Sequence, residues 1–526
     1  MSHLNSERQT GLTRRRFISD SGKALAVGAL GTGSIGSLLA ACGGSPSTTS
    51  SGPTTVTYTF MAFSSLTDAP AVATAMSNTA KLKKLNIKVS LNPIDSASYD
   101  QKLQLGYAAG QTYDMVFTAP WTDNYTQNAL KGNFLALDDL LPQYAPDLYH
   151  SMPTAFWDAV RVNGKIYGAP NQNYFAYVFG LFLVKKYADK YADTIPATIT
   201  SYADIEPYLA AVKQDEPNVT PVYMTDTGVA GGLLFSAIDH GIDAFAGSTG
   251  LAGIYYADKN LKVFNVFESP EYQQAVELRW KWKQLGYFKK DPVPAAVSVA
   301  QVQAGEYAML IGQQAKPNDI PTIQQHFGIP MTVKQIGTPF LTTNGLLQNM
   351  NSIVRTSQHP DQVLQFMNVL NTDAEVFNLL CHGIEGKHYV FVNKAEKLIG
   401  FPSGVTATTD AYNPGSDWMF GNEQNGYYTD PSSVGVFANI QQANNTATRS
   451  TAFGFTFDPT NVKTEIAQLN ALIGPIPTGA MPTALQYGKL DPQKLPSYLS
   501  QLKQAGADTV VAEAQKQLDA WAAKQK

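Results

Sequence analysis

The chain has 526 residues, with 38 Lys and Arg against 42 Asp and Glu and a formal net charge of −4. This acidic balance argues against nucleic acid or anionic lipid as the main partner, because both attract basic surfaces. The only cysteines are Cys42 and Cys381, so the chain lacks the disulfide framework that stabilises small secreted domains. A chain of this length can instead be held together by its own hydrophobic core.

The first 41 residues have the composition of an export signal. Basic residues, including the pair Arg14-Arg15, precede an uncharged stretch over residues 24–41 that ends in small side chains. The arginine pair followed by Phe-Ile resembles a twin-arginine signal. Leu39-Ala40-Ala41-Cys42 resembles a bacterial lipobox, in which cleavage leaves a lipid-modified cysteine at the new N-terminus. A membrane-spanning helix is disfavoured because glycines interrupt the apolar stretch. We therefore predict a twin-arginine lipoprotein signal peptide over residues 1–41, with lipidation at Cys42.

The residues after the signal are predicted to tether a large acidic body to the membrane. Residues 42–54 are rich in Gly, Ser, Thr and Pro, which favours a flexible linker. Without residues 1–41 the chain keeps 33 Lys and Arg against 40 Asp and Glu. No later apolar run approaches the length of a membrane span. The predicted location is therefore extracytoplasmic, with a lipid anchor in a bacterial cell membrane.

The folded part begins with alternating strand and helix patterns. Residues 56–60 and 87–91 are predicted strands, and residues 68–85 and 99–108 have helical spacing. A short buried strand, Met115-Val116-Phe117, comes next. This order is typical of βαβ units on a parallel sheet, and the predicted fold class is therefore α/β.

A second series of elements begins after Gly180. Residues 181–184 form a predicted strand, and Ser201-x-x-Asp204 predicts the start of a helix. Another helix is predicted from Ser269-Pro270 to Gly286. Two amphipathic helices are expected near the C-terminus, over residues 495–502 and 510–521.

Four segments resemble one protein family, the extracellular solute-binding proteins of ABC-type sugar importers (the maltose-binding-protein-like group). The resemblance spans essentially residues 55–526. Its segments are Asp114–Phe117 with the following Trp121, Gly164–Pro170, Gly305–Gly312 and Gly383–Tyr389. The last of these is the most specific and is similar to a signature of the larger lipoprotein-type oligosaccharide binders. We interpret Gly383 and Gly386 as turn glycines and Lys387 and His388 as structural residues.

The resemblance implies a two-lobe fold with a hinge and a ligand cleft between discontinuous lobes. The N-terminal lobe would contain residues 55–175 plus about 350–400, and the C-terminal lobe residues 176–349 plus about 401–526. We expect the chain to cross between the lobes near 172–180 and 342–352, with a third passage at 395–415. Ligands of open α/β sheets bind beyond the carboxyl ends of the strands.

The candidate ligand-binding residues combine aromatic rings with amides and carboxylates, because rings stack on pyranose faces and polar groups bind hydroxyls. Among the 26 Tyr, 25 Phe and 6 Trp, most are expected in the core. An amide run where the family pattern suggests a carboxylate, and Gln313-Gln314 where it suggests a ring, argue against maltose. The candidates are Trp121, Asn171, Asn173, Tyr174, Tyr223, Asp226, Gln313, Asn349 and Trp418.

Motifs for other chemistries are missing from the sequence. There is no GxxxxGK[ST], HExxH, CxxC or GxSxG pattern, and the GxGxxG match at residues 31–36 lies in the leader. We predict no cofactor, no catalytic residue and no metal site, although spacing alone leaves calcium open. The expected function is capture of an oligosaccharide by a monomeric, non-enzymatic protein that delivers it to ABC permease subunits. A surface-anchored carbohydrate-active hydrolase and a receptor feeding a sensor kinase are the alternatives.

Overall fold

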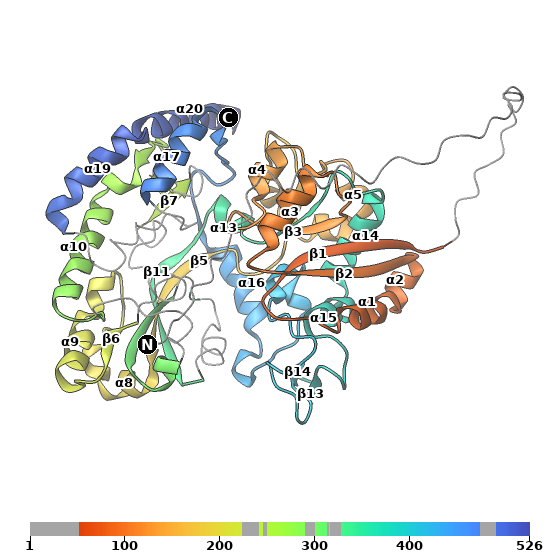
Figure 1. Ribbon diagram of the computed structural model, residues 1–526, viewed down its shortest axis with the longest axis horizontal. Coiled ribbons are helices and arrows are strands. Elements are labelled where there is room, and N and C mark those ends of the chain that lie inside the picture. Colours follow the sequence, from red (N-terminus) through yellow and green to blue (C-terminus); the bar gives the residue numbers. More distant parts are fainter. Residues whose placement is uncertain are drawn as a thin grey trace, which may run out of the picture. The chain divides into compact units, whose positions relative to one another are not determined.

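The computed structural model describes residues 52–223, 241–245, 250–289, 300–312, 315, 328–473 and 491–525. The predicted signal peptide, its Cys42 and nearly all of the tether lie outside these residues, so those expectations stay predictions. Figure 1 shows the described elements as two groups, each built around a central sheet.

The first sheet has the strand order β2-β1-β3-β12-β4. Strand β1 pairs in parallel with β2 and β3, as the βαβ pattern predicts, and β12 runs antiparallel between β3 and β4. The bounds are β1 (Thr54–Ala62), β2 (Ile87–Asp95), β3 (Met115–Thr118), β4 (Gly168–Pro170) and β12 (Met350–Ile353).

Helices cover both faces of this sheet (Figure 1). The connection from β1 to β2 and the connection from β2 to β3 lead to opposite sides of β1, so right-handed crossovers place their helices on opposite faces. The predicted helix over 68–85 is broken into two, because Thr79 leaves the helical conformation and caps the second segment. The bounds are α1 (Ala69–Ser77), α2 (Ala80–Lys84), α3 (Tyr99–Ala108), α4 (Tyr125–Leu130), α5 (Leu141–Tyr144), α6 (Pro146–His150), α7 (Thr154–Ala159), α13 (Thr343–Leu347), α14 (Pro360–Thr372) and α15 (Ala374–His382).

The second sheet has the order β15-β11-β5-β10-β6. Its central strand β5 extends the predicted strand 181–184 and pairs antiparallel with both β10 and β11. The bounds are β5 (Tyr177–Val184), β6 (Thr220–Val222), β10 (Tyr307–Gly312), β11 (Met331–Leu341) and β15 (Thr448–Arg449), with helices α8 (Lys185–Lys190), α9 (Glu206–Asp215), α10 (Pro270–Gln284) and α16 (Val436–Thr446).

The predicted helix starts in this part are confirmed. The Ser201 backbone N–H donates to Asp204 Oδ2 at 3.0 Å at the start of a 3-10 turn that leads into α9. Ser269 Oγ accepts from the Tyr272 backbone N–H at 3.1 Å and caps α10. Gly286 comes after this helix with φ of 71°, a conformation that favours glycine.

A third group of elements forms a smaller unit, which the sequence analysis did not predict as distinct from the C-terminal lobe. Strands β7 (Ile242–Phe245), β8 (Ala252–Tyr255) and β9 (Phe264–Asn265) form an antiparallel sheet. Helix α20 (Ala507–Gln525) buries Val510, Ala514 and Leu518 against this group, as its amphipathic pattern predicts. The other helices of this part are α17 (Lys463–Ile473) and α19 (Leu495–Gln504). Hairpin strands β13 (Val390–Asn393) and β14 (Leu398–Gly400) complete the described strands.

The described residues pack into three hydrophobic cores, which trace the passages of the chain between lobes. Phe175 belongs to the first core and Tyr174 to the second, which locates one passage near the expected 172–180. Strand β11 lies in the second sheet, and its last residue, Leu341, already packs in the first core.

The third passage differs from the expectation. Tyr412, Met419 and Phe420 belong to the first core, whereas Tyr428 and Phe437 pack against the second. The passage therefore lies after Phe420 and not at 395–415. The expected assignment of residues from about 401 onward to the C-terminal lobe is wrong for this stretch. Its apolar residues are carried by loops and a short 3-10 turn, which give no periodic pattern from which to assign them.

The segment Gly383–Tyr389 ties the end of α15 to the start of α1. His388 is buried, its Nδ1 accepts from the Ile384 backbone N–H at 2.9 Å, and its Nε2 lies 3.0 Å from Asp68 Oδ2. Lys387 Nζ pairs with the same Asp68 oxygen at 2.5 Å. These contacts lower the pKa of Asp68, Lys387 contributing most. The motif therefore has a structural role and links the two helices, as the sequence predicts for Lys387 and His388.

Gly383→Ala should destabilise the protein by about 2–4 kcal/mol. Gly383 has φ of 78° and ψ of −144°, a region almost restricted to glycine, and an added Cβ would lie 2.3 Å from His388 Nδ1. Urea unfolding measures the effect. Gly386→Ala is the matched control, since Gly386 has φ of 80° with nothing within 4 Å of an added Cβ. Equal losses in the two variants would show that contact with His388 adds nothing.

Candidate functional site

Four loops meet at one edge of the first sheet. Strands β1 and β3 are parallel and end there, and β12, antiparallel to β3, begins there. Strand β4 is antiparallel to β12, so it also ends at this edge. The residues that come after β1, β3 and β4, and those that precede β12, are therefore neighbours. This is the edge at which open α/β sheets bind ligands.

An aromatic cluster of Phe63, Trp121 and Trp418 lies at this edge. The Trp418 ring centroid is 6.0 Å from that of Trp121 and 6.2 Å from that of Phe63. Phe117, from β3, lies beneath both tryptophans, at 5.8 Å from Trp121 and 5.7 Å from Trp418. Trp121 and Trp418 are half-buried, and Phe63 is 56% exposed. The cluster therefore exposes ring surface while it packs on the first core.

Hydrogen bonds to backbone hold the two tryptophans in place. Trp121 Nε1 donates to the Gln348 carbonyl at 3.0 Å, which links the loop after β3 to the segment before β12. Trp418 lies in a 3-10 turn, Asp417–Met419, and its carbonyl accepts from Asn173 Nδ2 at 3.0 Å. The Met419 carbonyl accepts from Asn171 Nδ2 at 2.6 Å. The amide run after β4 thus fixes the turn that carries Trp418.

Asn351 is the centre of a buried polar network under this turn. It is 3% exposed, and its Nδ2 donates to Asn171 Oδ1 at 2.7 Å and to the Met419 carbonyl at 3.2 Å. Its Oδ1 accepts from the Tyr58 hydroxyl at 2.9 Å. Strands β1 and β12, the loop after β4 and the 3-10 turn Asp417–Met419 are therefore joined by one set of hydrogen bonds.

Another amide, Asn444 on α16, holds the first passage between the lobes. Its Oδ1 accepts from the backbone N–H groups of Phe175 at 2.8 Å and Ala176 at 3.1 Å, and its Nδ2 donates to the Asn173 carbonyl at 2.6 Å. The Gln172 backbone N–H donates to the Gly421 carbonyl at 2.5 Å, so two passages run side by side. The site edge is therefore directly beside the candidate hinge.

The structure brings only part of the predicted set together. Trp121 and Trp418 share the aromatic cluster, and the half-buried Asn349 lies next to them, its carbonyl accepting from the Asn171 N–H at 2.8 Å. Asn171 and Asn173 are each 2% exposed, with amide groups that donate to backbone. These two residues position Trp418, whereas the sequence suggested direct contact with hydroxyls.

The remaining predicted residues lie elsewhere. Tyr174 and Tyr223 are buried in the second core, and the ring of Tyr223 packs edge-on against Tyr307 at 5.1 Å. Asp226 and Gln313 lie outside the described residues. Phe63 was missed, because nothing in its sequence neighbourhood distinguishes it from a strand residue. Its position within three residues of the end of the predicted strand 56–60 was the available signal.

Titratable groups with shifted pKa values lie close in sequence to both tryptophans. Burial raises the pKa of Asp417, whose Oδ2 lies 3.5 Å from His382 Nε2. Burial likewise raises the pKa of the Cys381 thiol, which is therefore an inert core residue. Two residues after Trp121, burial raises the pKa of Asp123 to about 7. Asp123 is fully buried and accepts from the Tyr107 hydroxyl at 2.8 Å and from Asn128 Nδ2 at 2.9 Å.

Asp123 should make stability fall as pH rises from about 4 to about 7, by as much as about 4 kcal/mol. The pKa in the folded protein is above the ordinary value of a carboxyl, so the folded state binds more protons than the unfolded state in this window. Asp123→Asn should remove this slope. Urea unfolding between pH 4 and pH 8 measures it, with Asp193→Asn, an exposed site, as the control. The same slope in Asp123→Asn and in the parent would contradict the assignment.

The described part of the chain has neither a membrane span nor a metal-binding cluster. No helix there is long and apolar enough to cross a membrane. Nor do three or more His, Cys, Asp or Glu side chains gather there in a way that could hold a metal ion.

The fold and the site edge define the class of a two-lobe binding protein. Residues 75–386 match a family model described as bacterial extracellular solute-binding protein. The chain therefore belongs to this family, whose members are non-enzymatic binding components of transport that act outside the cytoplasm. This confirms the expected two-lobe α/β fold and the expected lack of catalytic activity, and it argues against the hydrolase alternative. Residues 451–523 also match a domain of unknown function (DUF3502).

Related proteins agree with this assignment. A carbohydrate ABC transporter substrate-binding protein from Streptococcus pneumoniae serotype 4 is 27% identical over 460 residues, which cover 83% of this chain and 85% of the relative. The crystal structure of the N-glycan transport solute-binding protein NgtS from S. pneumoniae matches with a TM-score of 0.77 and 23% identity, covering 90% of this chain and 100% of that one. An HMO-binding solute-binding protein from Bifidobacterium longum infantis matches with a TM-score of 0.56 and 15% identity, covering 89% and 99%.

Proposed function

We propose that this protein is a lipid-anchored extracytoplasmic receptor that captures an oligosaccharide and delivers it to an ABC-type import permease. The S. pneumoniae relative is a carbohydrate ABC transporter substrate-binding protein. Crystal structures of NgtS with Man1GlcNAc and with Man5GlcNAc also match this chain in fold, with TM-scores of 0.70 and 0.67. The carbohydrate transported with the relative and the glycans bound in the NgtS complexes support a glycan as the ligand class of this protein.

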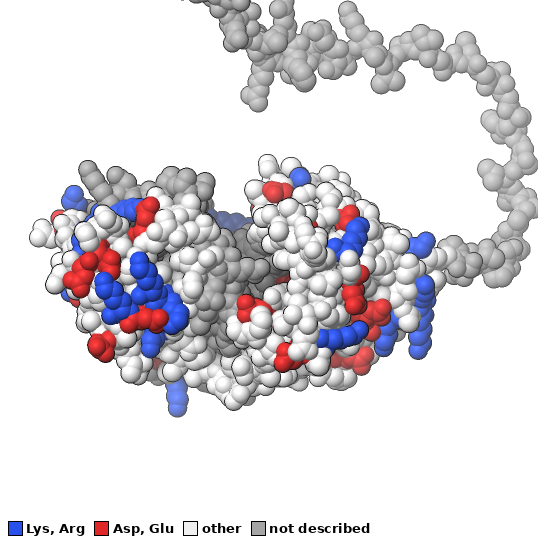
Figure 2. Space-filling view, turned by 90° about the horizontal axis from the view of Figure 1, so that it is seen from below, with Lys and Arg blue, Asp and Glu red and all other residues white. Residues whose placement is uncertain are grey.

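The observation that carries the proposal is the aromatic cluster at the strand ends of the first sheet. Phe63, Trp121 and Trp418 offer contiguous ring surface on a rigid support, which is how proteins bind the apolar faces of pyranoses. Figure 2 shows a recess between the two halves of the molecule, and the described residues around it are mostly uncharged. A neutral sugar suits such surroundings better than an anionic or cationic solute.

Capture is proposed to work through hinge closure. The aromatic cluster would hold one face of the glycan on the N-terminal lobe, and the C-terminal lobe would close over the other face. A ligand that contacts both lobes shifts the population towards the closed form, which the permease would recognise. From the core contacts we propose lobes of residues 55–175 plus 341–420 and of residues 176–340 plus 421–526. Asp226 and Gln313 are retained as candidates on the closing side, whereas Tyr174 and Tyr223, buried in the second core, are not.

A thermal-shift panel tests the ligand class. The chain without its leader and Cys42 would be heated with Man1GlcNAc, Man5GlcNAc, kestose and maltose. A ligand at about 100 times its Kd stabilises the folded state by about 2.7 kcal/mol, so a melting temperature raised by a few degrees is expected with at least one mannose-containing glycan. No rise with any saccharide would contradict the proposal.

Cys42→Ala should stop lipidation and release or mislocalise the protein. The Arg14-Arg15 pair and the Leu39–Cys42 box motivate this prediction. Two acyl chains hold a protein at a membrane, whereas none leaves only weak adsorption. Fractionation and mass spectrometry of the N-terminal peptide measure the outcome, with Cys381→Ala as the control because that thiol is buried. An unmodified Cys42 within an uncut chain would contradict the anchor.

An importer component and a sensor component would share the same binding step and differ in where the liganded protein then docks. Deleting the permease genes should abolish growth on the captured glycan if the protein delivers its ligand for import. Growth unchanged after that deletion, with loss of glycan-dependent gene expression when this protein is removed, would favour the receptor that feeds a sensor kinase.

A further inference from the structure

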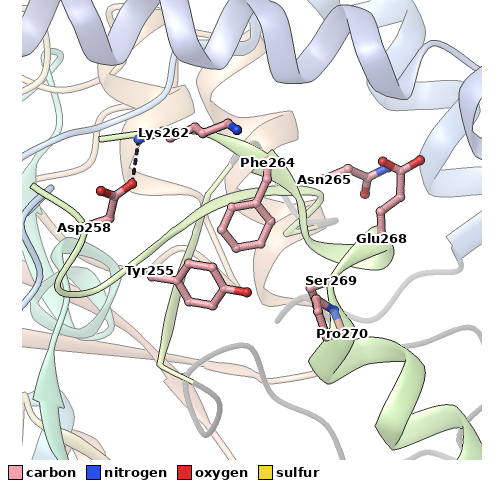
Figure 3. A pocket seen from close by; sticks show the side chains of 8 residues that line it. All are labelled: Tyr255, Asp258, Lys262, Phe264, Asn265, Glu268, Ser269 and Pro270. Atoms are coloured by element: carbon pink, nitrogen blue, oxygen red, sulfur yellow. Dashed lines mark hydrogen bonds between the residues drawn. The ribbon is translucent and has the colours of Figure 1, made fainter. Parts of the chain in front are cut away.

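A cavity of about 360 Å³ lies on the third group of elements, beside the β8–β9 hairpin and the start of α10 (Figure 3). Two aromatic side chains, Tyr255 and Phe264, and several polar groups line it. None of its lining residues belongs to the aromatic cluster or to the buried network beneath it. The volume is within the range of small-molecule sites.

The backbone pairing places both rings on one face of the hairpin. Gly253 pairs with Phe264, so Tyr255 is the diagonal neighbour of Phe264 on the same face. The two ring centroids are 4.8 Å apart with an angle of 33° between the planes. Gly253 puts no side chain opposite Phe264, and a Cβ there would lie 2.9 Å from the Asp243 carbonyl oxygen. The two rings therefore form a continuous apolar patch at the surface.

The orientation of the Tyr255 side chain is fixed although the residue is 38% exposed. Its hydroxyl donates to the Glu271 carboxylate at 3.1 Å, which ties the end of β8 to the first turn of α10. A pre-positioned ring binds a sugar face without first losing rotational freedom. Phe264 packs partly against the third core, whereas Tyr255 is not among the residues of that core, so the ring of Tyr255 is the more exposed of the two.

Polar groups of both signs surround the rings (Figure 3). Asp258 is held by accepting from the Lys262 backbone N–H at 3.0 Å, and the Lys262 side chain is exposed. Glu268 pairs with Lys503 at 2.8 Å, so the charges nearly balance. Asn265, 5% exposed, has a buried Nδ2 with no hydrogen-bond partner among the described residues. Two adjacent aromatic rings, surrounded by polar groups whose charges nearly cancel, fit a neutral polyhydroxylated ring better than an ion.

We propose that this pocket is an accessory carbohydrate site that binds one hexopyranose unit, stacked on Tyr255 and Phe264. Asp258 and Glu268 accept from its hydroxyls, and Lys262 donates to them. One ring on two aromatic side chains gives weak binding, with a Kd of about 1–10 mM. The site shares with the proposed function only the ligand class, since none of its residues contributes to the aromatic cluster.

Saturation-transfer NMR of the chain without its leader and Cys42 tests the proposal, with methyl α-mannopyranoside and N-acetylglucosamine as probes. The measurements use a Trp418→Ala background, which weakens binding at the aromatic cluster. Adding Tyr255→Ala should weaken the remaining binding by about fivefold or more, whereas Tyr255→Phe, which keeps the ring, should leave it within about twofold. Lys262→Ala, at an exposed side chain, provides a second variant if Tyr255→Ala unfolds, and should weaken binding about threefold.

Two results would overturn the proposal. One is a saturation-transfer signal that is equally strong in the Trp418→Ala protein with and without Tyr255→Ala. The other is the absence of saturation transfer to either probe. The main site is assessed separately, by calorimetry of Man1GlcNAc with Tyr255→Ala alone, in which affinity should stay within about twofold of the parent. If the parent does not bind Man1GlcNAc but the probes still bind in a Tyr255-dependent way, the proposed function is rejected and the accessory site is still supported.

Discussion

Trp418→Ala should weaken glycan binding by at least about tenfold, with little loss of stability. Trp418 is the central ring of the aromatic cluster, within 6.2 Å of both Phe63 and Trp121. It is half-buried, and its carbonyl, not its side chain, accepts from Asn173. The variant thus removes stacking surface and keeps the turn. Calorimetric titration beside a urea unfolding curve separates the two effects.

The matched control for this variant is Phe401→Ala. Phe401 is 38% exposed and comes directly after β14, away from the strand ends that carry the aromatic cluster. Its replacement should leave affinity within about twofold of the parent. If Trp418→Ala left the affinity for the glycan unchanged and lowered the urea unfolding midpoint, Trp418 would be a core residue that does not contact the ligand.

Asn351→Ala should destabilise the protein by about 2–4 kcal/mol and weaken glycan binding as a consequence. Asn351 is 3% exposed and joins Tyr58, Asn171 and the Met419 carbonyl. Its loss leaves the Asn171 oxygen buried without that donor, and such a group costs about 1–3 kcal/mol. The turn that carries Trp418 then loses one of its supports. Urea unfolding measures the first effect and calorimetry the second.

Asn445→Ala provides the control for an asparagine without such a network. Asn445 is exposed on α16, next to the buried Asn444. A change within about 0.5 kcal/mol is expected, as for most surface substitutions. If Asn351→Ala changed stability equally little, the hydrogen bonds of Asn351 would not be what holds the turn Asp417–Met419.

Local sequence patterns were sufficient to predict most of the elements that build the site edge. The helix predicted over 99–108 is α3, and the strand predicted at 115–117 is β3, with Thr118 added. These elements have clear periodicity and come after turn residues, so short-range signals decide them. The same holds for α10, whose start, first turn and stop are all specified by adjacent residues.

The roles of the polar site residues could not be predicted, because they depend on contacts between distant parts of the chain. Asn171 and Asn173 are typical of ligand-binding amides in sequence, but their partners are carbonyls 248 and 245 residues away. Asn444, which holds the first passage, is 271 residues from its Asn173 partner. Only the fold reveals such pairs. Trp418 was predicted because it lies in an irregular stretch that is unusually aromatic, whereas Phe63 lies close to the predicted strand 56–60, where aromatic residues are expected in the core.

Calorimetric titration of the chain without its leader and Cys42 with Man5GlcNAc tests glycan capture at the aromatic cluster most directly. We expect a single tight site per molecule, with affinity reduced at least about tenfold by Trp418→Ala and the glycan recovered intact. The absence of binding heat with Man5GlcNAc and with the other saccharides of the panel, or recovery of a cleaved glycan, would contradict this function.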